Sequence, residues 1–318
     1  MIAVLAAIFE RFIGYPAWVT DRIGHPVIWI GNLIDALDRR YNDPGKPFES
    51  RRIWGVFAII AVVLVTLAVT LGIQQLLHFV PFGWLFEILL ASTLIAQKSL
   101  RDAVLSVARA LEKDGIQAAR IAVAHIVGRD TAQLDEAEVS RAAIETLAEN
   151  TSDGVIAPML FLALFGLPGA AVYKAINTAD SMIGHRSERH AAFGWASAKL
   201  DDLVNFVPAR LTAGLIALAA RAMPSADARA AWETALRDAP GHASPNAGWP
   251  EAAMAGALGF SLGGPRAYSG KTLDLPGMGT GKRELSADDI ATAIRLYDRA
   301  MLFALGALAV WAVMRMVL

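Results

Sequence analysis

The sequence predicts an all-α, polytopic membrane protein with broken or re-entrant helices and a cytoplasmic helical layer. Hydrophobic residues make up 55% of the 318 residues and charged residues only 19%, and the mean hydropathy is +0.43. This apolar share is above that of most soluble globular proteins. Long apolar segments alternate with polar, helix-periodic ones, and Pro, Gly or a charge interrupts several of the apolar segments. The bilayer is therefore the expected environment.

Composition also excludes several functional classes. The formal net charge of −1 gives no general attraction to nucleic acid, so no nucleic-acid partner is expected. The chain has no Cys, which excludes disulfides, thiolate nucleophiles and Cys-ligated zinc. The six His form no HExxH motif and no close pair, so a zinc enzyme is not expected.

Residues 1–97 form the first predicted region, an N-terminal membrane region with a basic cytoplasmic loop. Residues 1–18 lack a basic start and a cleavage site, which favours a retained membrane or interfacial helix over a signal peptide. Residues 53–77 are uncharged and exceed the roughly 20 residues needed to span a bilayer. Lys and Arg concentrate in residues 38–52 and are absent from 78–83, which predicts that 38–52 is cytoplasmic. Residues 83–97 are expected to return the chain to that side.

Residues 98–299 form the second region, which is expected to be catalytic, and residues 300–318 form a C-terminal membrane helix. Apolar residues at three- and four-residue spacing predict a cytoplasmic helical layer over 98–149. Residues 155–176 are apolar but broken by GLPG, and they fit two half-helices or one kinked span equally well. Residues 203–220 leave the same alternatives open. The polar, Gly- and Pro-rich stretch 221–299 must be cytoplasmic if it shares a site with Glu149.

A first polar cluster lies just before the broken apolar segment. On a helix, Arg141, Glu145 and Glu149 fall at i, i+4 and i+8 and share one face. For the first two, a solvated salt-bridge ladder is the alternative. Four more hydrogen-bonding side chains follow: Asn150, Thr151, Ser152 and Asp153. Capping of the next helix by Ser152 or Asp153 is the alternative to a functional role.

A second polar cluster lies within residues 173–211. It begins with Lys174, Asn177, Asp180 and Ser181 at helical spacing, continues through a loop with His185, Arg186, Arg189 and His190, and ends with Lys199, Asp201, Asp202 and Asn205. A carboxylate pair with an amide one turn later suits Mg²⁺, which prefers hard oxygen ligands. Isolated acids at a membrane boundary are often only solvated, but charges between apolar stretches are costly and usually functional.

A third cluster places Ser244, Asn246 and Glu251 on a Pro- and Gly-rich turn that leads into a small-residue helix, and a purely structural turn is the alternative. Nearby, residues 276–283 fail the P-loop pattern because Pro276 replaces its first Gly and Arg283 replaces its Ser or Thr. The glycines of 262–265 and 277–279 are still able to bind phosphate through backbone N–H groups, although this signal is weak.

Five stretches in one order carry a family resemblance: HPVIWIGNLI (25–34), LDEAEVSRAAIETLAENTSDGVIAP (134–158), YKAINTADSMIGHR (173–186), FGWASAKLDDLVNFVPARLTA (193–213) and HASPNAGWPEAAMAGALG (242–259). Together they resemble the integral-membrane cobinamide-phosphate synthase family of cobalamin biosynthesis. One departure lies near the N-terminus, where the family tends to show an acid in the first helix and a GDP turn. This chain has Glu10 and GYP (14–16) there, which weakens any role for that region.

The resemblance implies ATP-dependent amide formation between adenosylcobyric acid and (R)-1-aminopropan-2-ol phosphate, or the free amino alcohol, to give adenosylcobinamide phosphate. It implies ATP and Mg²⁺ as cofactors, the corrinoid and the aminopropanol phosphate as substrates, and membrane lipid as a partner. Other cobalamin-pathway enzymes are candidate partners. The expected location is the cell inner membrane, as a multi-pass protein whose active site faces the cytoplasm.

Such chemistry requires activation of a carboxylate, most simply as an acyl phosphate, and a base for the attacking amine. The candidates for catalysis are Glu145, Glu149 and Asp153, and those for magnesium are Asp180, Asp201 and Asp202. Lys174, Arg186, Lys199 and Arg210 are expected to contact phosphates. The remaining expected substrate-binding residues are Asn150, Ser152, Asn177, Asn205, Ser244, Asn246 and Glu251.

Two alternatives come from other functional classes. The segments NTADS and DDLVN resemble the Asp-rich metal motifs of intramembrane prenyltransferases, although those motifs usually hold more acids at fixed spacing. The broken apolar segments also fit a non-enzymatic corrinoid transporter or scaffold. Formation of product from ATP would separate the synthase from both.

Overall fold

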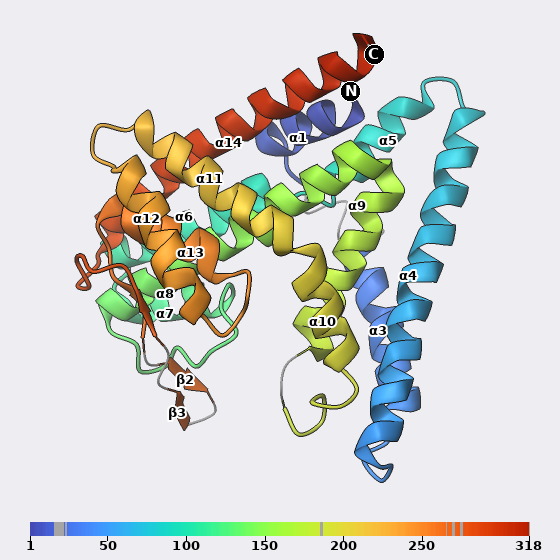
Figure 1. Cartoon of the computed structure of the whole chain (residues 1–318), viewed down its shortest axis with the longest axis horizontal. Coiled ribbons are helices and arrows are strands. Elements are labelled where there is room, and N and C mark those ends of the chain that lie inside the picture. The colour runs from blue at the N-terminus through green and yellow to red at the C-terminus, as the bar shows by residue number, and fades with distance from the viewer. Residues whose placement is uncertain are drawn as a thin grey trace. The chain divides into compact units, whose positions relative to one another are not determined.

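The computed structural model describes residues 1–15, 22, 24–184, 187–264, 266–268, 271–273 and 276–317. Among them the all-α prediction is confirmed, because helices make up nearly all of the regular structure (Figure 1). The described residues group into two compact units. Unit 1 comprises Met1–Ala96, Ala157–Asn205 and Trp311–Leu318, and unit 2 comprises Gln97–Ile156 and Phe206–Val310.

The helices of unit 1 are α1 (Ile2–Phe12), α3 (Pro26–Tyr41), α4 (Phe48–His78), α5 (Gly83–Ser92), α9 (Ala157–Ile183) and α10 (Trp195–Val204). Those of unit 2 are α6 (Gln97–Lys113), α7 (Ile116–Ala124), α8 (Glu136–Asn150), the π-helix η1 (Thr151–Ile156), α11 (Phe206–Arg221), α12 (Ala228–Asp238), the 3₁₀ turn η2 (Ala239–Gly241) and α13 (Gly248–Leu258). Helix α14 (Ala287–Val317) begins in unit 2 and ends in unit 1.

The strands described in unit 2 are short and antiparallel. Strand β1 (Leu262–Gly263) pairs with β4 (Gly277–Met278), with Leu262 opposite Met278. Strand β2 (Arg266–Tyr268) pairs with β3 (Lys271–Leu273), with Arg266 opposite Leu273. These hairpins lie within the stretch that the sequence marked as Gly- and Pro-rich.

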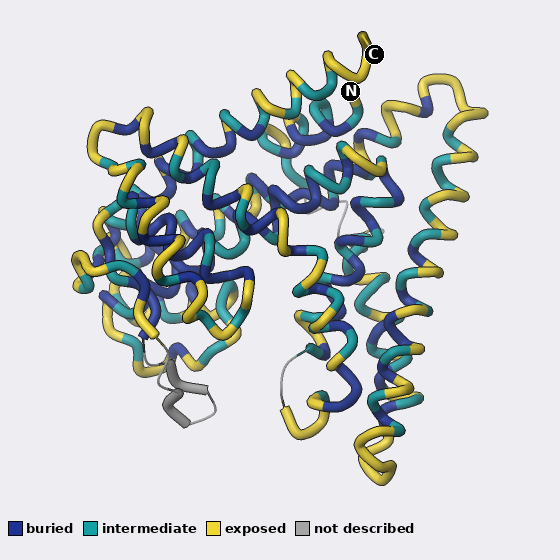
Figure 2. The backbone as a smooth tube through the Cα atoms, viewed as in Figure 1, coloured by how far each residue is buried: buried dark blue, intermediate teal, exposed yellow. Residues whose placement is uncertain are grey.

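Helix α4 confirms the predicted long apolar helix at 53–77. It runs for 31 residues, and its most apolar window has a mean hydropathy of 2.9. A helix of this length rises about 46 Å, which exceeds the roughly 30 Å of a hydrocarbon core. Exposed residues recur along it (Figure 2), and they include large hydrophobic side chains such as Ile60, Leu64 and Leu71. Apolar surface of this kind suits contact with lipid.

The polytopic prediction is also confirmed by length and composition. Besides α4, the stretches Glu136–Ile183 and Ala287–Val317 are long and apolar enough to cross a membrane. Helices α10 and α11 are bent by 45° to each other and count as a further span if taken together. The C-terminal helix predicted at 300–318 is therefore present, although it begins at Ala287.

Two short helices bear on the N-terminal predictions. Helix α5 has 10 residues and α1 has 11, so each rises only about 15–17 Å and is too short to span the bilayer as a single helix. Of the two alternatives for residues 1–18, the length of α1 therefore favours an interfacial helix, and the return of the chain through 83–97 stays a prediction. At the end of α5 the hydroxyls of Ser92 and Thr93 donate to the carbonyls of Leu89 and Leu90. Such local hydrogen bonds compete with helix propagation.

Helix α9 is broken at Gly166, as the GLPG segment indicated. Gly166 has φ 67° and ψ −164°, a conformation that is essentially restricted to glycine. Pro168 follows and has no N–H to continue the hydrogen-bond ladder. Two helical halves therefore meet at Gly166, and the ribbon of α9 changes direction along its length (Figure 1).

The core of unit 1 joins α3, α4, α9 and the turn before α10. Its buried members are Ile34, Ala58, Ile59, Val62, Ala175, Ala179, Ile183 and Phe193. Gly55 brings the α4 backbone close to that turn, because a Cβ at Gly55 would lie only 1.9 Å from the carbonyl oxygen of Phe193. This close approach fixes α4 against the loop that links α9 to α10.

Unit 2 is built around α8. Every residue from Val139 to Ala148 is buried, and α8 contacts α6, α7, α13 and η1. The helical layer predicted for 98–149 is confirmed as α6 to α8, and its cytoplasmic location stays a prediction. The small-residue helix predicted after residue 247 is α13, which packs closely against α12 and α11.

Candidate functional site

In unit 1 the second polar cluster forms a hydrogen-bonded network around Asp201. The side-chain amide of Asn177 donates to Oδ1 of Asp201 at 3.3 Å, and that of Asn205 donates to Oδ2 at 2.9 Å. The hydroxyl of Tyr173 donates to Oδ1 of Asn205 at 2.8 Å. Asp201, Asn205 and Tyr173 are buried. The structure thus brings together three predicted residues, Asn177, Asp201 and Asn205, and adds Tyr173.

The charge around Asp201 fits a cation. Asp180 and Asp202 lie close enough to interact electrostatically with Asp201, and neighbouring carboxylates favour binding of a positive ion. Among the described residues, no three or more His, Cys, Asp or Glu side chains form a metal-binding group. Asp202 instead pairs with Lys199 at 2.9 Å. In phosphate-handling sites Mg²⁺ is usually held by one or two carboxylates together with substrate phosphates, so a magnesium site at these acids stays a prediction.

A second network in unit 1 holds the turn between α9 and α10. Arg189 donates to Oδ2 of Asp38 at 2.6 Å, and the amide of Asn42 donates to Oδ1 of Asp38 at 2.7 Å. Arg51 donates to the Asn42 side chain at 2.8 Å and to the carbonyl of Arg189. Burial opposes the charge on Asp38, but the hydrogen bonds from Asn42 and Arg189, with the nearby charges of His190 and Arg189, hold its pKa below the ordinary value. Asp38 is therefore a charged anchor.

Lys174 and Arg186 complete the predicted residues of this part of the chain. Lys174 lies half-buried on α9, one helical turn before Thr178, whose hydroxyl donates to the Lys174 carbonyl at 2.7 Å. Arg186 lies outside the described residues.

In unit 2, Glu145 is buried and held by two donors. The backbone N–H of Gly263 donates to Oε1 at 2.7 Å, and Arg129 pairs with Oε2 at 3.2 Å. The solvated-ladder alternative for Arg141 and Glu145 is wrong, because both side chains are buried. These contacts make Glu145 an anchor for the β1 turn. Its predicted catalytic role is not tested by these contacts.

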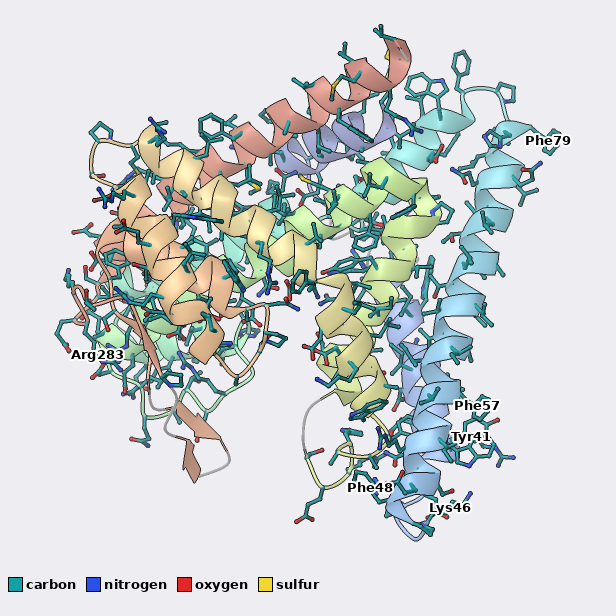
Figure 3. The ribbon with its side chains drawn as sticks, in the orientation of Figure 1. Tyr41, Lys46, Phe48, Phe57, Phe79 and Arg283 are labelled. Atoms are coloured by element: carbon teal, nitrogen blue, oxygen red, sulfur yellow. The ribbon has the colours of Figure 1, made fainter. Side chains whose placement is uncertain are left out.

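Three arginines surround this anchor. Arg141 donates to the carbonyl of Arg283 at 2.8 Å, and Arg283 donates to the carbonyl of Gly263 at 3.3 Å. Arg129 pairs with Glu145. The positive charge of Arg141 is attracted by the nearby carboxylates of Glu138, Asp135 and Glu145. Arg283 is labelled in Figure 3. In the sequence Arg283 is notable only as a mismatch to the P-loop pattern, and Arg129 belongs to no motif.

The segment 151–156 is a π-helix that continues α8 without a cap. The capping alternative for Ser152 and Asp153 is therefore wrong. Ser152 is fully buried, and its hydroxyl has no hydrogen-bond partner among the described residues. Glu149, Asn150 and Asp153 are half-buried, and Asn150 donates to the carbonyl of Thr146 at 3.1 Å. Short π-helical turns are rare in proteins, but those that occur are often at functional sites. The turn at 151–156 therefore supports a functional role for this segment.

The third cluster assembles around Arg210 in unit 2. Arg210 donates to Oδ1 of Asn246 at 3.0 Å and to the carbonyl of Phe206 at 2.8 Å, and it lies over the Phe206 and Trp249 rings. Ser244 accepts from the backbone N–H groups of Asn246 and Ala247, each at 3.2 Å. The structure thus brings Arg210, Ser244 and Asn246 together.

Glu251 lies next to this cluster as a buried acid at the start of α13. It is 1% exposed, and His242 Nε2 lies 3.7 Å from its Oε1. The Nδ1 of His242 accepts from the backbone N–H of Ser244 at 3.0 Å. His242 therefore connects Glu251 to the Ser244 turn. The Ser244 hydroxyl accepts two backbone N–H groups and so stabilises this turn, while its role in substrate binding stays a prediction.

The predicted residues thus divide between the two units. Lys174, Asn177, Asp180, Lys199, Asp201, Asp202 and Asn205 belong to unit 1, and Glu145, Glu149, Asn150, Ser152, Asp153, Arg210, Ser244, Asn246 and Glu251 belong to unit 2. Five residues of these networks were not predicted from the sequence to take part in them: Tyr173, Asp38, Asn42, Arg51 and Arg129. Tyr173 stood directly before Lys174 in a quoted motif, but a tyrosine in an apolar helix gives no signal of its own.

Comparison with known proteins gives the family. The model of the family described as CobD/Cbib protein matches residues 3–297. The chain belongs to this family. It is 46% identical over 304 residues to "Cobalamin biosynthesis protein CobD" of Brucella suis biovar 1 (strain 1330), with 95% of this chain and 93% of that protein covered. The CobD/Cbib family therefore accounts for nearly the whole chain, and the protein has a role in cobalamin biosynthesis.

Two further relatives agree with this CobD/Cbib assignment. A CobD of Rhodobacter capsulatus is 46% identical over 301 residues, covering 94% of this chain and 92% of that protein. The CobD of Sinorhizobium fredii is 45% identical over 303 residues, covering 94% of this chain and 93% of that protein. No solved structure matches the chain.

Proposed function

We propose that the chain is an adenosylcobinamide-phosphate synthase. In this reaction ATP drives amide formation between adenosylcobyric acid and (R)-1-aminopropan-2-ol phosphate or the free amino alcohol. The observation that carries the proposal is the CobD/Cbib match over residues 3–297. The matched range contains all four groups of polar contacts described above, around Asp201, Asp38, Glu145 and Arg210. The printed names of the relatives support the pathway, and the reaction itself is our proposal.

The proposed reaction has two balanced steps. A carboxylate oxygen of the corrinoid attacks the γ-phosphorus of ATP, so that the bond to the bridging oxygen breaks, ADP leaves and an acyl phosphate forms. The amine then attacks the acyl carbon, loses one proton to a base and expels inorganic phosphate. Activation is needed because a carboxylate is a poor electrophile, and positive charge around the transferring group stabilises it.

Residue roles follow from the contacts of each side chain. Because Glu145 is occupied by Gly263 and Arg129, we assign the base to Glu149 or Asp153, which are half-buried beside the π-helical turn. Asp180, Asp201 and Asp202 are assigned to Mg²⁺, which when bound would neutralise phosphate charge. Arg210 and Lys174 are assigned to phosphate oxygens. Asn246 and Asn177 would orient polar groups of the substrates.

The proposed location is the cell inner membrane, with the reaction on the cytoplasmic side. The basic residues before α4 support this orientation, because cytoplasmic loops carry an excess of Lys and Arg. Membrane lipid and other cobalamin-pathway enzymes remain proposed partners. Since the matched relatives are cobalamin biosynthesis proteins, the prenyltransferase alternative is not carried further.

The decisive experiment is an assay of membranes that contain the protein. Adenosylcobyric acid, ATP and Mg²⁺ are incubated with each amino alcohol in turn, and the product masses are measured together with ADP and phosphate. We expect one new amide and one ADP per product. Corrinoid flux across the membrane without ATP-dependent product would overturn the proposal and favour a transporter.

Three variants test the site in the same assay. Glu149→Gln and Asp202→Asn remove candidate carboxylates, and Glu233→Gln is the control, because Glu233 pairs with Arg229 on the exposed face of α12. We expect Glu149→Gln to lower kcat by on the order of 10²-fold if it is the base, and the control to retain full activity. Full activity of both Glu149→Gln and Asp202→Asn, with normal membrane insertion, would remove these two role assignments.

A further inference from the structure

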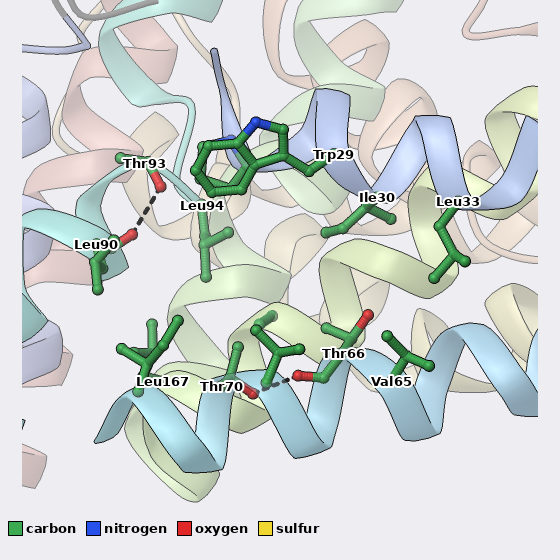
Figure 4. A pocket seen from close by; sticks show the side chains of 14 residues that line it. Trp29, Ile30, Leu33, Val65, Thr66, Thr70, Leu90, Thr93, Leu94 and Leu167 are labelled. Carbon is green, nitrogen blue, oxygen red and sulfur yellow. Dashed lines mark hydrogen bonds between the residues drawn. The ribbon is translucent and has the colours of Figure 1, made fainter. Parts of the chain in front are cut away.

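Unit 1 contains an apolar cavity that none of the proposed roles uses. Its volume is about 190 Å³, and it lies between α3, α4, α5 with the turn that follows it, and the second half of α9 (Figure 4). Trp29, Ile30 and Leu33 of α3 form one wall. The facing wall comes from α4 and consists of Val65, Thr66, Val69, Thr70 and Ile73.

The lining of the cavity selects an apolar occupant. Apart from three threonines, every side chain that lines it is apolar. The hydroxyl of Thr70 donates to the carbonyl of Thr66 at 2.7 Å, and that of Thr93 donates to the carbonyl of Leu90 at 2.7 Å. Two of the three hydroxyls are therefore occupied within their own segments, and a polar ligand would replace few of its hydrogen bonds to water.

The cavity opens on the side of α4 that suits lipid. Trp29, Val65 and Val69 line it and are 53%, 46% and 55% exposed, whereas Leu94 and Ala171 line it and are each 4% exposed. It therefore has an exposed mouth between α3 and α4 and a closed end near Leu94 and Ala171. The mouth lies within the uncharged stretch 53–77 of a helix long enough to cross the membrane, so hydrocarbon surrounds it.

We propose that this cavity binds one acyl chain of a membrane phospholipid, which enters laterally from the bilayer. Apolar cavities of about 150 Å³ stay free of water and accept small apolar molecules, and this cavity is larger. Its exposed mouth is continuous with the lipid-facing surface of α4, so the nearest apolar ligand is the lipid itself. The bound chain contacts four segments of unit 1, including the half of α9 that carries Lys174, Asn177 and Asp180. This inference is independent of the proposed reaction.

The test uses a phospholipid whose acyl chain carries a photoactivatable diazirine near its methyl end. The full chain is reconstituted in phosphatidylcholine and phosphatidylglycerol vesicles that contain this lipid, irradiated, and mapped by mass spectrometry. We expect label on Leu94 and Ala171, which line the cavity and are buried. Label on Ile60 and Leu64, with none on Leu94 or Ala171, would overturn the proposal.

Matched variants separate cavity binding from general lipid contact. Val69→Trp obstructs the mouth and Ala171→Phe fills the closed end, while Ala68→Phe adds a ring at an exposed α4 residue that does not line the cavity. We expect labelling of Leu94 to fall about tenfold in the first two, equivalent to about 1.4 kcal/mol, and to stay at the wild-type level in the third. If Ala171→Phe does not fold, Val69→Trp carries the comparison. Undiminished labelling in every folded cavity variant would overturn the proposal.

Discussion

At the scale of single residues, the networks consist of buried polar groups that satisfy one another. Asp201 receives two amide donors, Asp38 receives an amide and a guanidinium, and Glu145 receives a backbone N–H and a guanidinium. A buried polar atom that loses its partner keeps the full cost of its desolvation. Single substitutions here are therefore expected to have large and specific effects.

Removal of one hydroxyl tests the Asp201 network. Tyr173→Phe leaves Oδ1 of buried Asn205 without its 2.8 Å donor, so we expect a loss of roughly 1–3 kcal/mol in the free energy of unfolding. Tyr41→Phe is the matched control, because the half-buried Tyr41 ring stacks on Trp54 and its substitution should change stability by about 0.5 kcal/mol or less. Unfolding in detergent measures both. Equal effects of the two variants would contradict a special role for the Tyr173 hydroxyl.

The pH dependence of stability tests Asp38. Its folded pKa is lowered, so its stabilisation is fully present above its unfolded pKa of about 3.9 and is lost as the pH falls through the lower folded value. Asp38→Asn should therefore destabilise the protein at neutral pH, by roughly 1–3 kcal/mol, and the difference from wild type should shrink below about pH 4.

Asp35→Asn provides the control for this measurement. Asp35 is on the same helix and pairs with Arg39, but both side chains are exposed. Exposed pairs contribute about 0–1 kcal/mol, so the control should show little change at any pH. The measurement is the melting temperature of wild type, Asp38→Asn and Asp35→Asn at pH values from 7 to 3. A difference between Asp38→Asn and wild type that stays constant over this range would refute the role assigned to the Asp38 charge.

At the scale of helices and turns, close backbone contact decides how α4 packs. The Gly55 backbone approaches the carbonyl of Phe193, and the turn that contains Phe193 is also held by Asp38 and Arg51. The π-helical turn after α8 and the break at Gly166 likewise depend on local backbone geometry. Helix amphipathicity in the sequence reports none of these features directly.

Two glycines of α4 test the contact. Gly55→Ala places a Cβ 1.9 Å from the Phe193 carbonyl oxygen, so the backbone must shift, at a cost of about 1–3 kcal/mol or more. Gly72→Ala has no atom within 4 Å of its Cβ and should be neutral or stabilising, since Ala favours helix by about 1 kcal/mol over Gly. Thermal unfolding in the same detergent compares them. Similar melting temperatures would show that α4 does not depend on this contact.

At the scale of the whole molecule, the residues at the two ends of α4 predict how the chain is oriented in the membrane. Lys46 and Phe48 lie near one end of α4 and Phe79 lies at the other (Figure 3). Tyr41 and Phe57 are near the Lys46 end, where Tyr41 stacks on Trp54 and Arg52 lies over the Trp195 ring. Aromatic and basic residues of this kind concentrate at membrane interfaces.

Cysteine labelling tests this orientation without background, because the chain has no Cys. Lys46→Cys and Val80→Cys introduce single thiols at exposed positions before and after α4. In intact cells we expect a membrane-impermeant maleimide to label Val80→Cys only, and a permeant one to label both. The two variants are each other's control. Impermeant labelling of Lys46→Cys instead would reverse the proposed topology.

The sequence by itself determined the helical class, the α4 span and the location of the polar clusters, because hydropathy and 3.6-residue periodicity are local properties of the chain. It also indicated that GLPG breaks a helix, since Gly and Pro act through their own backbone. Only the tertiary structure decided that Glu145 is held by Arg129 and Gly263, and that Tyr173 joins the Asp201 network. These outcomes depend on partners far apart in the chain, and no local pattern encodes the distance between them.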